Sequence, residues 1–365
     1  MVDNRIRFHE PHLQAVSRSF AFGISRLKRD LRASVGLAYL ICRILDTIED
    51  AQWTDSWAQQ QAFDTFDACM TNAPLETLST WVQGFPKSIN NGERALIADA
   101  AKIFTEFHSL TLSEKSAMLD PILSMSRGMR EFALRAHRED ALRPILKLRD
   151  LADVNTYCFF VAGVVGELLT RLVEEEIILR PNGLKLSDED GIHFGLFLQK
   201  INVLKDQWPD EKENRFLVPD REAMLKSLRR DAQGALRYLE SIPLERQDYR
   251  LFCAWSLFLG LATVPLLRES EKPVDGAEGT APKLSRLRAT ALGVRIEIAI
   301  GNPARTAALA NELVVLAWPE SAPSLMSTLA PTAAITDDDR VSTILESCYS
   351  GRIDLGSLRT LLTER

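Results

Sequence analysis

The chain has 365 residues, of which 46% are hydrophobic and 26% are charged, and its formal net charge at pH 7 is −6. These proportions are typical of a folded globular protein and not of a disordered one. The acidic balance argues against a protein that binds nucleic acid, which needs a basic face to displace counterions from phosphates. Five separated cysteines with no CxxC pair indicate reduced thiols and argue against a zinc site.

Apolar residues recur at helical spacing in seven segments, whereas signals for strands are scarce. Ser187 followed by Asp190 indicates a capped helix start. We therefore predict an all-α fold that forms one helical domain over residues 1–365, best supported over 17–219, with a mobile loop at 270–282 and a C-terminal helical segment at 283–365. In chain order, the predicted helices cover residues 34–48, 94–110, 150–173, 188–204, 220–239, 249–267 and 286–300, and the other predicted linkers cover 75–92, 179–187 and 209–219.

The N-terminus lacks the apolar core of a signal peptide. No continuous apolar run reaches the roughly 18 to 20 residues of a membrane span. We expect a soluble cytoplasmic protein, for which peripheral contact with a membrane stays open. The sequence predicts no oligomeric state.

Two pairs of aspartates stand at the ends of predicted helices. Asp46 and Asp50 are four residues apart, as are Asp206 and Asp210, so the carboxylates of each pair share a helix face. One pair alone is more often a solvated helix face than a site. Asp206 and Asp210, however, follow a long apolar run, and like charges beside a buried segment are expensive without a counterion. A cation explains them, and Mg²⁺ suits one or two carboxylates combined with substrate phosphates.

Such a device suits the ionisation of an allylic diphosphate, because Mg²⁺ neutralises the leaving group as a Lewis acid. The remaining carbocation needs a dry apolar or aromatic cavity. Phe159, Phe160, Phe194 and Phe197 precede the acidic ends and are candidates for its wall, although phenylalanines at helical spacing are more often ordinary core residues.

Three segments resemble the signatures of the squalene and phytoene synthase family, in the family's order. Residues 17–50 (SRSFAFGISRLKRDLRASVGLAYLICRILDTIED) resemble the first signature, residues 157–172 (YCFFVAGVVGELLTRL) the second, and residues 195–219 (GLFLQKINVLKDQWPDEKENRFLVP) the third. The Ser-Arg-Ser-Phe and Asp-Thr-x-Glu-Asp motifs resemble those of squalene synthases more than those of phytoene synthases. The resemblance implies the all-α isoprenoid synthase fold, with helices around a central active-site cavity.

The resemblance also implies roles for individual residues. The implied metal ligands are Asp46, Asp50, Asn202, Asp206 and Asp210. The implied diphosphate-binding residues are Ser17, Arg18, Phe20, Arg43, Gln199, Asn202, Lys205 and Arg215. The implied catalytic residues are Tyr39, Tyr157 and Arg43, although Arg43 could merely pair with a neighbouring aspartate and both tyrosines could be core residues.

The implied reaction is the head-to-head condensation of two farnesyl diphosphates through presqualene diphosphate to squalene. It depends on Mg²⁺ and uses NADPH, for which the sequence locates no site. Alternatives are a synthase that stops at presqualene diphosphate or makes another coupled product, a terpene cyclase, and a catalytically silent relative that acts as an assembly or binding module. The four retained aspartates argue against the silent relative.

Three departures from the family pattern fall in the third signature, and one is that residues 215–219 (RFLVP) lack the aromatic pair that squalene synthases tend to show after the arginine. Lys205 stands where the family usually has arginine, which keeps the charge but loses the forked grip on a phosphate. Pro209 disfavours helix at the preceding residue, which predicts that Asp210 lies beyond the end of the helix.

Overall fold

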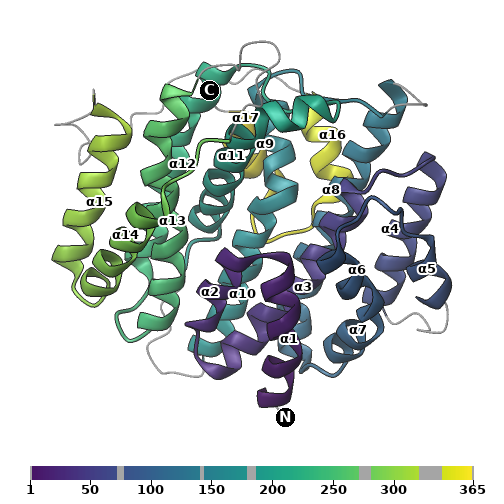
Figure 1. Cartoon of the computed structure of the whole chain (residues 1–365), viewed down its shortest axis with the longest axis horizontal. Coiled ribbons are helices and arrows are strands. Elements are labelled where there is room, and N and C mark those ends of the chain that lie inside the picture. Colours follow the sequence, from purple (N-terminus) through teal and green to yellow (C-terminus); the bar gives the residue numbers. More distant parts are fainter. Residues whose placement is uncertain are drawn as a thin grey trace. The chain divides into compact units, whose positions relative to one another are not determined.

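The structure is a computed structural model that describes residues 2–71, 78–139, 144–178, 186–270, 281–319 and 339–363. Nearly all of these residues lie in helices or short connections (Figure 1), which confirms the predicted all-α fold. The exception is a ladder of two short strands, β1 (Leu146–Lys147) and β2 (Arg215–Phe216), beside which Leu148 N donates to Phe216 O at 3.0 Å.

The chain forms two compact units, and both are discontinuous in sequence. The first comprises Met1–Leu146, Glu167–Lys185 and Ser347–Arg352, and the second comprises Lys147–Gly166, Leu186–Glu346 and Ile353–Arg365. The single domain over residues 1–365 stays a prediction, and residues 271–280 of the predicted loop lie outside the described residues.

In the first unit α3 (Arg29–Asp50) is the central helix, since it packs against every other helix from α1 to α8 except α5. Leu37, Leu40, Ile41 and Ile44 are fully buried, as the apolar spacing of this segment predicts. The surrounding helices are α1 (Val2–Val16), α2 (Arg18–Ser25), α4 (Ser56–Met70), α5 (Leu78–Gly84), α6 (Asn91–Ala98), α7 (Ala100–His108) and α8 (Leu112–Glu139).

In the second unit α11 (Asp188–Lys212) is the central helix, and Figure 1 shows it between α9 and α12. Ser187 caps its start by accepting a hydrogen bond from Asp190 N at 3.1 Å, as predicted. The other elements of this unit are α9 (Leu151–Cys158), the π-helix η2 (Phe159–Gly163), α12 (Arg221–Ser241), α13 (Gln247–Glu269), α14 (Arg286–Ala299), α15 (Pro303–Ala317) and α17 (Leu355–Thr363), while α10 (Val164–Ile178) and α16 (Asp339–Cys348) run on into the first unit.

Glycines let α11 approach η2 and the start of α10 at backbone distance. A Cβ atom on Gly195 would lie 2.2 Å from Ala162 O, and one on Gly166 would lie 1.9 Å from Gly191 O. Both distances are far below van der Waals contact, so only glycine permits this crossing. The close contact fixes the first half of α11 against its neighbour.

All seven predicted helices are confirmed, with local differences. The segment at 94–110 is divided at Asp99 into α6 and α7, and the segment at 150–173 contains the π-turn η2. The predicted linker at 75–92 is wrong in part, because it contains α5, whose Trp81 is buried and donates its indole N–H to Ala62 O at 3.1 Å. A helix of seven residues is too short to show a periodic pattern.

The prediction that Asp210 lies beyond the helix end is wrong. α11 continues through Pro209 to Lys212. A proline this close to the C-terminus removes a single backbone donor, the one that would bond to the Lys205 carbonyl. The packing of α11 against its neighbours outweighs that loss.

Two helical stretches, Leu151–Glu174 and Gln247–Glu269, are long and apolar enough to cross a membrane, although no continuous apolar run predicts this. Within the protein, 72% and 56% of their most apolar windows are buried. A buried core helix has the same composition.

Candidate active site

Asp46 and Asp50 lie in the last turns of α3, which ends at Asp50. Because the C-terminal end of a helix carries a partial negative charge, carboxylates there are unfavourable unless a cation compensates them. The Asp46 carboxylate is 3.8 Å from Arg43 Nη1 and keeps 28% of its side-chain surface exposed. This end of α3 can therefore accept a further cation from solvent.

Arg43 is anchored on two sides. Its guanidinium pairs with Asp46 and donates a short hydrogen bond to Glu93, while within the described part of the chain its buried Nε has no hydrogen-bond partner. Burial lowers the pKa of Arg43, but Asp46 and Glu93 together raise it above its usual value. The side chain thus stays a fixed cation beside the aspartates.

Ser17, Phe20 and Tyr39 come together at the start of α2. Ser17 Oγ accepts a hydrogen bond from Phe20 N at 3.4 Å, and the rings of Phe20 and Tyr39 are 5.3 Å apart. Burial raises the pKa of Tyr39, an effect that a hydrogen bond with Ser17 reduces. Tyr39 is one helical turn before Arg43, so these residues line one face of α3. The side chain of Arg18 lies outside what the structure describes.

The second group occupies one face of α11. Gln199, Asn202, Asp206 and Asp210 recur at spacings of three or four residues and continue the face that carries Gly195. Asn202 is exposed, and the other three are partly exposed. We call these four residues the α11 polar face. Two of its four members are carboxylates near the negative end of the helix dipole, as on α3.

Lys205 lies beside this face. Its ammonium group is 3.0 Å from Asp206 Oδ2 and donates to Asn202 Oδ1 at 3.3 Å. The cation that replaces the family's usual arginine therefore contacts the predicted ligands themselves, as Arg43 does on α3.

Tyr157 and Arg215 are brought together although they are far apart in sequence. Tyr157 is 2% exposed, and its hydroxyl accepts a hydrogen bond from Arg215 Nη2 at 2.7 Å. Arg215 belongs to β2, directly after the turn at Asn214, whose φ of 62° is the one positive value among the described non-glycine residues. The ladder and the turn thus aim Arg215 at the tyrosine.

The four candidate wall residues, Phe159, Phe160, Phe194 and Phe197, are all buried in the second unit. The rings of Phe159 and Phe160 meet edge to face at 5.0 Å, and Phe194 contacts Tyr238 in the same way. Their part in a cavity wall stays a prediction.

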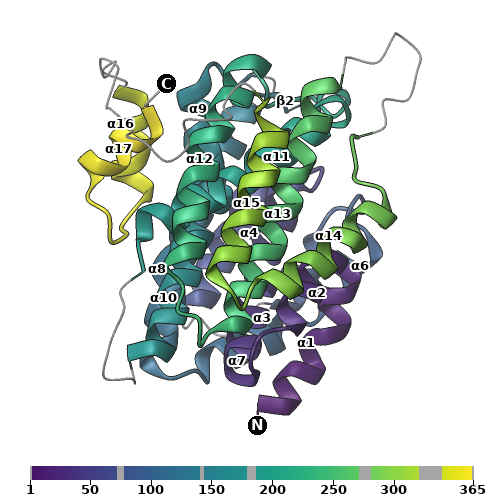
Figure 2. The same ribbon diagram turned by 90° about the vertical axis from the view of Figure 1, so that its left-hand side faces the viewer.

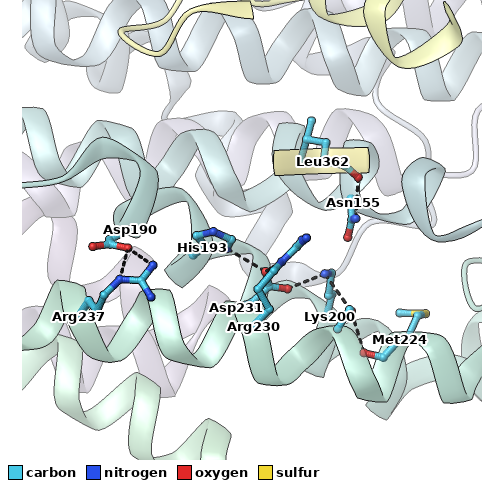
Figure 3. Close-up of polar contacts among 10 residues, drawn as sticks. Asn155, Asp190, His193, Lys200, Met224, Arg230, Asp231, Arg237 and Leu362 are labelled. Atoms are coloured by element: carbon cyan, nitrogen blue, oxygen red, sulfur yellow. Dashed lines mark hydrogen bonds and ion pairs between the residues drawn. The ribbon is translucent and has the colours of Figure 1, made fainter. Parts of the chain in front are cut away.

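Sequence reasoning missed a buried charged network under the α11 polar face (Figure 3). Lys200 and Asp231 are fully buried and form an ion pair at 2.5 Å, and His193 Nδ1 donates to the other oxygen of Asp231 at 2.9 Å. Lys200 also donates to Ser227 Oγ at 3.1 Å. The signal was a lysine within an apolar run, since a lysine is almost never fully buried without a partner.

The charges settle the protonation of Asp231. Burial raises the pKa of this carboxyl, but Lys200, His193 and Arg230 lower it well below its usual range. Asp231 is therefore ionised, and the network is a salt-bridged one.

The donors present fit Mg²⁺. The described residues contain no cluster of three or more His, Cys, Asp or Glu side chains that could hold a metal ion. They do provide a pair of carboxylates at the end of each central helix, and Mg²⁺ uses one or two carboxylates and takes its remaining ligands from water and substrate phosphates. Asp46 and Asp50 would hold one Mg²⁺ ion on α3, and Asp206 and Asp210, with Asn202, would hold another on α11.

Solved structures define the class of protein to which this fold belongs. The structure of TcSQS with the ligand E5700 has a TM-score of 0.69 and 22% identity, covering 95% of this chain and 97% of that one. A dehydrosqualene synthase in complex with a ligand has a TM-score of 0.52 and 18% identity, covering 81% and 96%. The chain thus has the all-α isoprenoid synthase fold.

The family follows from the sequence. A family model described as squalene/phytoene synthase matches residues 13–232, so the chain belongs to this family. The squalene synthase of Mycosarcoma maydis is 31% identical over 210 residues, which cover 57% of this chain and 34% of that protein. The squalene synthase of Saccharomyces cerevisiae is 27% identical over 290 residues, covering 72% and 62%. The matched region thus spans between a third and two thirds of these relatives.

Proposed function

We propose that the protein is a prenyltransferase that condenses two farnesyl diphosphates head to head through presqualene diphosphate to squalene, with Mg²⁺ and NADPH. The observation that carries the proposal is the placement of an aspartate pair at the C-terminal end of the central helix of each unit. Negative charge is unfavourable at that end of a helix, which gives both pairs a reason to bind cations. Membership of the squalene/phytoene synthase family supports the same chemistry.

The residues divide the work of diphosphate ionisation. Asp46, Asp50, Asp206 and Asp210 would hold Mg²⁺, which supplies the Lewis acid that makes diphosphate a leaving group. Fixed cations stand beside each pair and would neutralise the departing diphosphate without reorganisation. These cations are Arg43 beside Asp46 and Lys205 beside Asp206.

Two tyrosines would act near the reacting carbons. Tyr157 is positioned by the hydrogen bond from Arg215, so its hydroxyl has a defined orientation. Tyr39 contacts the ring of Phe20 and hydrogen-bonds with Ser17, and a phenol with an ordinary pKa of about 10 is protonated at neutral pH. A protonated phenol donates a hydrogen bond and is a weaker nucleophile toward a carbocation than a phenolate. We assign no residues to NADPH.

We further propose that the protein touches anionic membrane surfaces through α14. One face of this helix carries Leu287, Val294 and Ile298, which are 80%, 54% and 62% exposed, opposite the buried face that packs on α13. Figure 2 shows α14 on the near side of α13. Residues 283–305 contain one acid, Glu297, in a chain of net charge −6. Their basic residues are Lys283, Arg286, Arg288, Arg295 and Arg305, of which Arg295 pairs with Glu312. Exposed apolar side chains flanked by arginines suit an anionic lipid surface.

The test of the reaction is incubation of the purified protein with farnesyl diphosphate and Mg²⁺, with and without NADPH, followed by mass spectrometry of hydrocarbons and of phosphatase-treated extracts. Squalene formed only with NADPH is the expected result. Presqualene alcohol in both samples would instead show a synthase that stops halfway, and a cyclic terpene would show a cyclase. Unchanged substrate would refute the proposal. The protein would then be a binding module, or it would act on a prenyl diphosphate of another chain length.

A further inference from the structure

The interface between α11 and α12 contains polar contacts at three positions along the two helices. At the start of α11, Asp190 accepts two hydrogen bonds from Arg237, at 2.6 and 3.0 Å. Near its end, Gln207 Oε1 accepts from Arg221 at 2.6 Å. Between them lies the network of Lys200 and Asp231 with His193, drawn in Figure 3. A set of contacts spaced along two helices fixes both their axial register and their rotation.

The middle contact is the one of the three whose charged groups are both fully buried, although Gln207 of the contact near the end of α11 is also buried at 8% exposure. The side chains of Lys200 and Asp231 are 0% exposed, whereas Arg237 is 48% exposed. Solvent screens the Asp190–Arg237 pair and lets it adapt, but a buried charge that loses its partner has no water to replace it. A movement of α11 that breaks the middle contact therefore has the highest free-energy cost of the three.

Lys200 is interleaved with the α11 polar face. Gln199 directly precedes Lys200, Asn202 follows it by two residues, and Asp206 follows it by six residues. Lys200 points about 100° away from Gln199 around the helix, toward α12. Any rotation of α11 that loosens the Lys200–Asp231 contact thus turns the candidate ligands by the same angle.

We propose that Lys200 is a positioning residue: its buried ion pair with Asp231 sets the rotation of α11 and so holds Gln199, Asn202 and Asp206 in the orientation that binds magnesium and diphosphate. The inference rests on the proposed function. Side-chain tips lie about 5–6 Å from a helix axis, so a rotation of about 10° moves them by about 1 Å. Misplacement of this size can reduce a catalytic rate by about 100-fold.

Three variants separate positioning from simple support of the fold. Lys200→Met leaves Asp231 charged and without its buried cation, which lowers both stability and ligand binding. Lys200→Met combined with Asp231→Asn removes both charges and keeps an oxygen that accepts from His193, and neutral replacements of buried ion pairs often restore stability. Arg237→Met removes the exposed contact of the same interface and is the matched control.

The readouts are the urea midpoint of unfolding and the binding of Mg²⁺ with inorganic pyrophosphate by calorimetry, followed by kcat and KM. We expect the double variant to regain the urea midpoint of the wild type while binding magnesium pyrophosphate at least tenfold more weakly, and Arg237→Met to match the wild type in both. A double variant that regains both stability and affinity would show that the pair only supports the fold and would overturn the inference. If the wild type binds no magnesium pyrophosphate, the proposed function fails and the inference with it. Wild-type binding with unchanged affinity in all variants would refute the inference alone.

Discussion

The contact between α11 and η2 predicts that Gly195→Ala is strongly destabilising. The added Cβ would lie 2.2 Å from Ala162 O, 2.6 Å from Ala162 C and 2.9 Å from Gly163 Cα. All three atoms belong to the backbone, so no side chain can rotate away. To reach the shortest distance that real Cβ atoms adopt, the separation must widen from 2.2 Å to at least 3.0 Å.

The magnitude follows from what has to move. Overpacking that side chains can absorb is destabilising by about 1–3 kcal/mol. Here two helix backbones must separate, and α11 also packs on α12 and α13, so we expect the free energy of unfolding to fall by about 3 kcal/mol or more. Because Gln199 is one turn beyond Gly195 on the same face, the shift also displaces the α11 polar face.

The assay is urea denaturation followed by circular dichroism, with two companion variants. Gly84→Ala meets nothing within 4 Å and is expected to be neutral or to stabilise by up to about 1 kcal/mol. Gly260→Ala approaches Phe197 Cε1 at 2.9 Å, a ring atom that can yield, and should fall between the two. A Gly195→Ala protein within about 1 kcal/mol of the wild type would refute the close-contact reasoning.

Four further predictions concern the site, the charges, the thiols and the surface. Asp46→Asn and Asp206→Asn should each abolish turnover with little change in the urea midpoint. Glu222→Gln, whose side chain is 78% exposed, is the control and should leave turnover unchanged. An aspartate variant that keeps its activity, with a normal dependence of that activity on Mg²⁺, would contradict the assignment. The folded state lowers the pKa of Asp231, so its stabilisation is present above its unfolded pKa of about 3.9 and is lost as the pH falls below it. The urea midpoint of Asp231→Asn should accordingly fall less between pH 5 and pH 3 than that of the wild type. An equal fall in the urea midpoint of both proteins would count against this. Burial raises the pKa values of Cys158 and Cys253 to about 12 and that of Cys69 to about 11, so iodoacetamide at pH 8 should label these thiols only after unfolding, as mass spectrometry would show. Sedimentation with anionic vesicles should be lost when Leu287, Val294 and Ile298 are all changed to glutamine but kept in Leu112→Gln, a control that is 83% exposed, and equal sedimentation of both variants would exclude α14 as the contact.

The amino-acid sequence by itself determined the helices and placed the aspartate pairs at the ends of two of them. Periodic apolar residues predicted α3 and α11 because burial of a helix face depends on neighbours three and four residues apart, which a linear pattern contains. The same local spacing placed Asp46 with Asp50 and Asp206 with Asp210 on shared faces. The three signatures gave the family, which the family model over residues 13–232 confirms.

The tertiary structure alone decided which distant residues meet. Lys200 pairs with Asp231, which lies 31 residues later in the chain, and Tyr157 accepts a hydrogen bond from Arg215, which lies 58 residues later. No local pattern specifies these contacts, because they depend on how the helices pack. Packing also carried α11 through Pro209, against the local preference for an earlier end. Local spacing is encoded within a few residues, whereas the partner of a buried charge depends on the whole arrangement of helices around it.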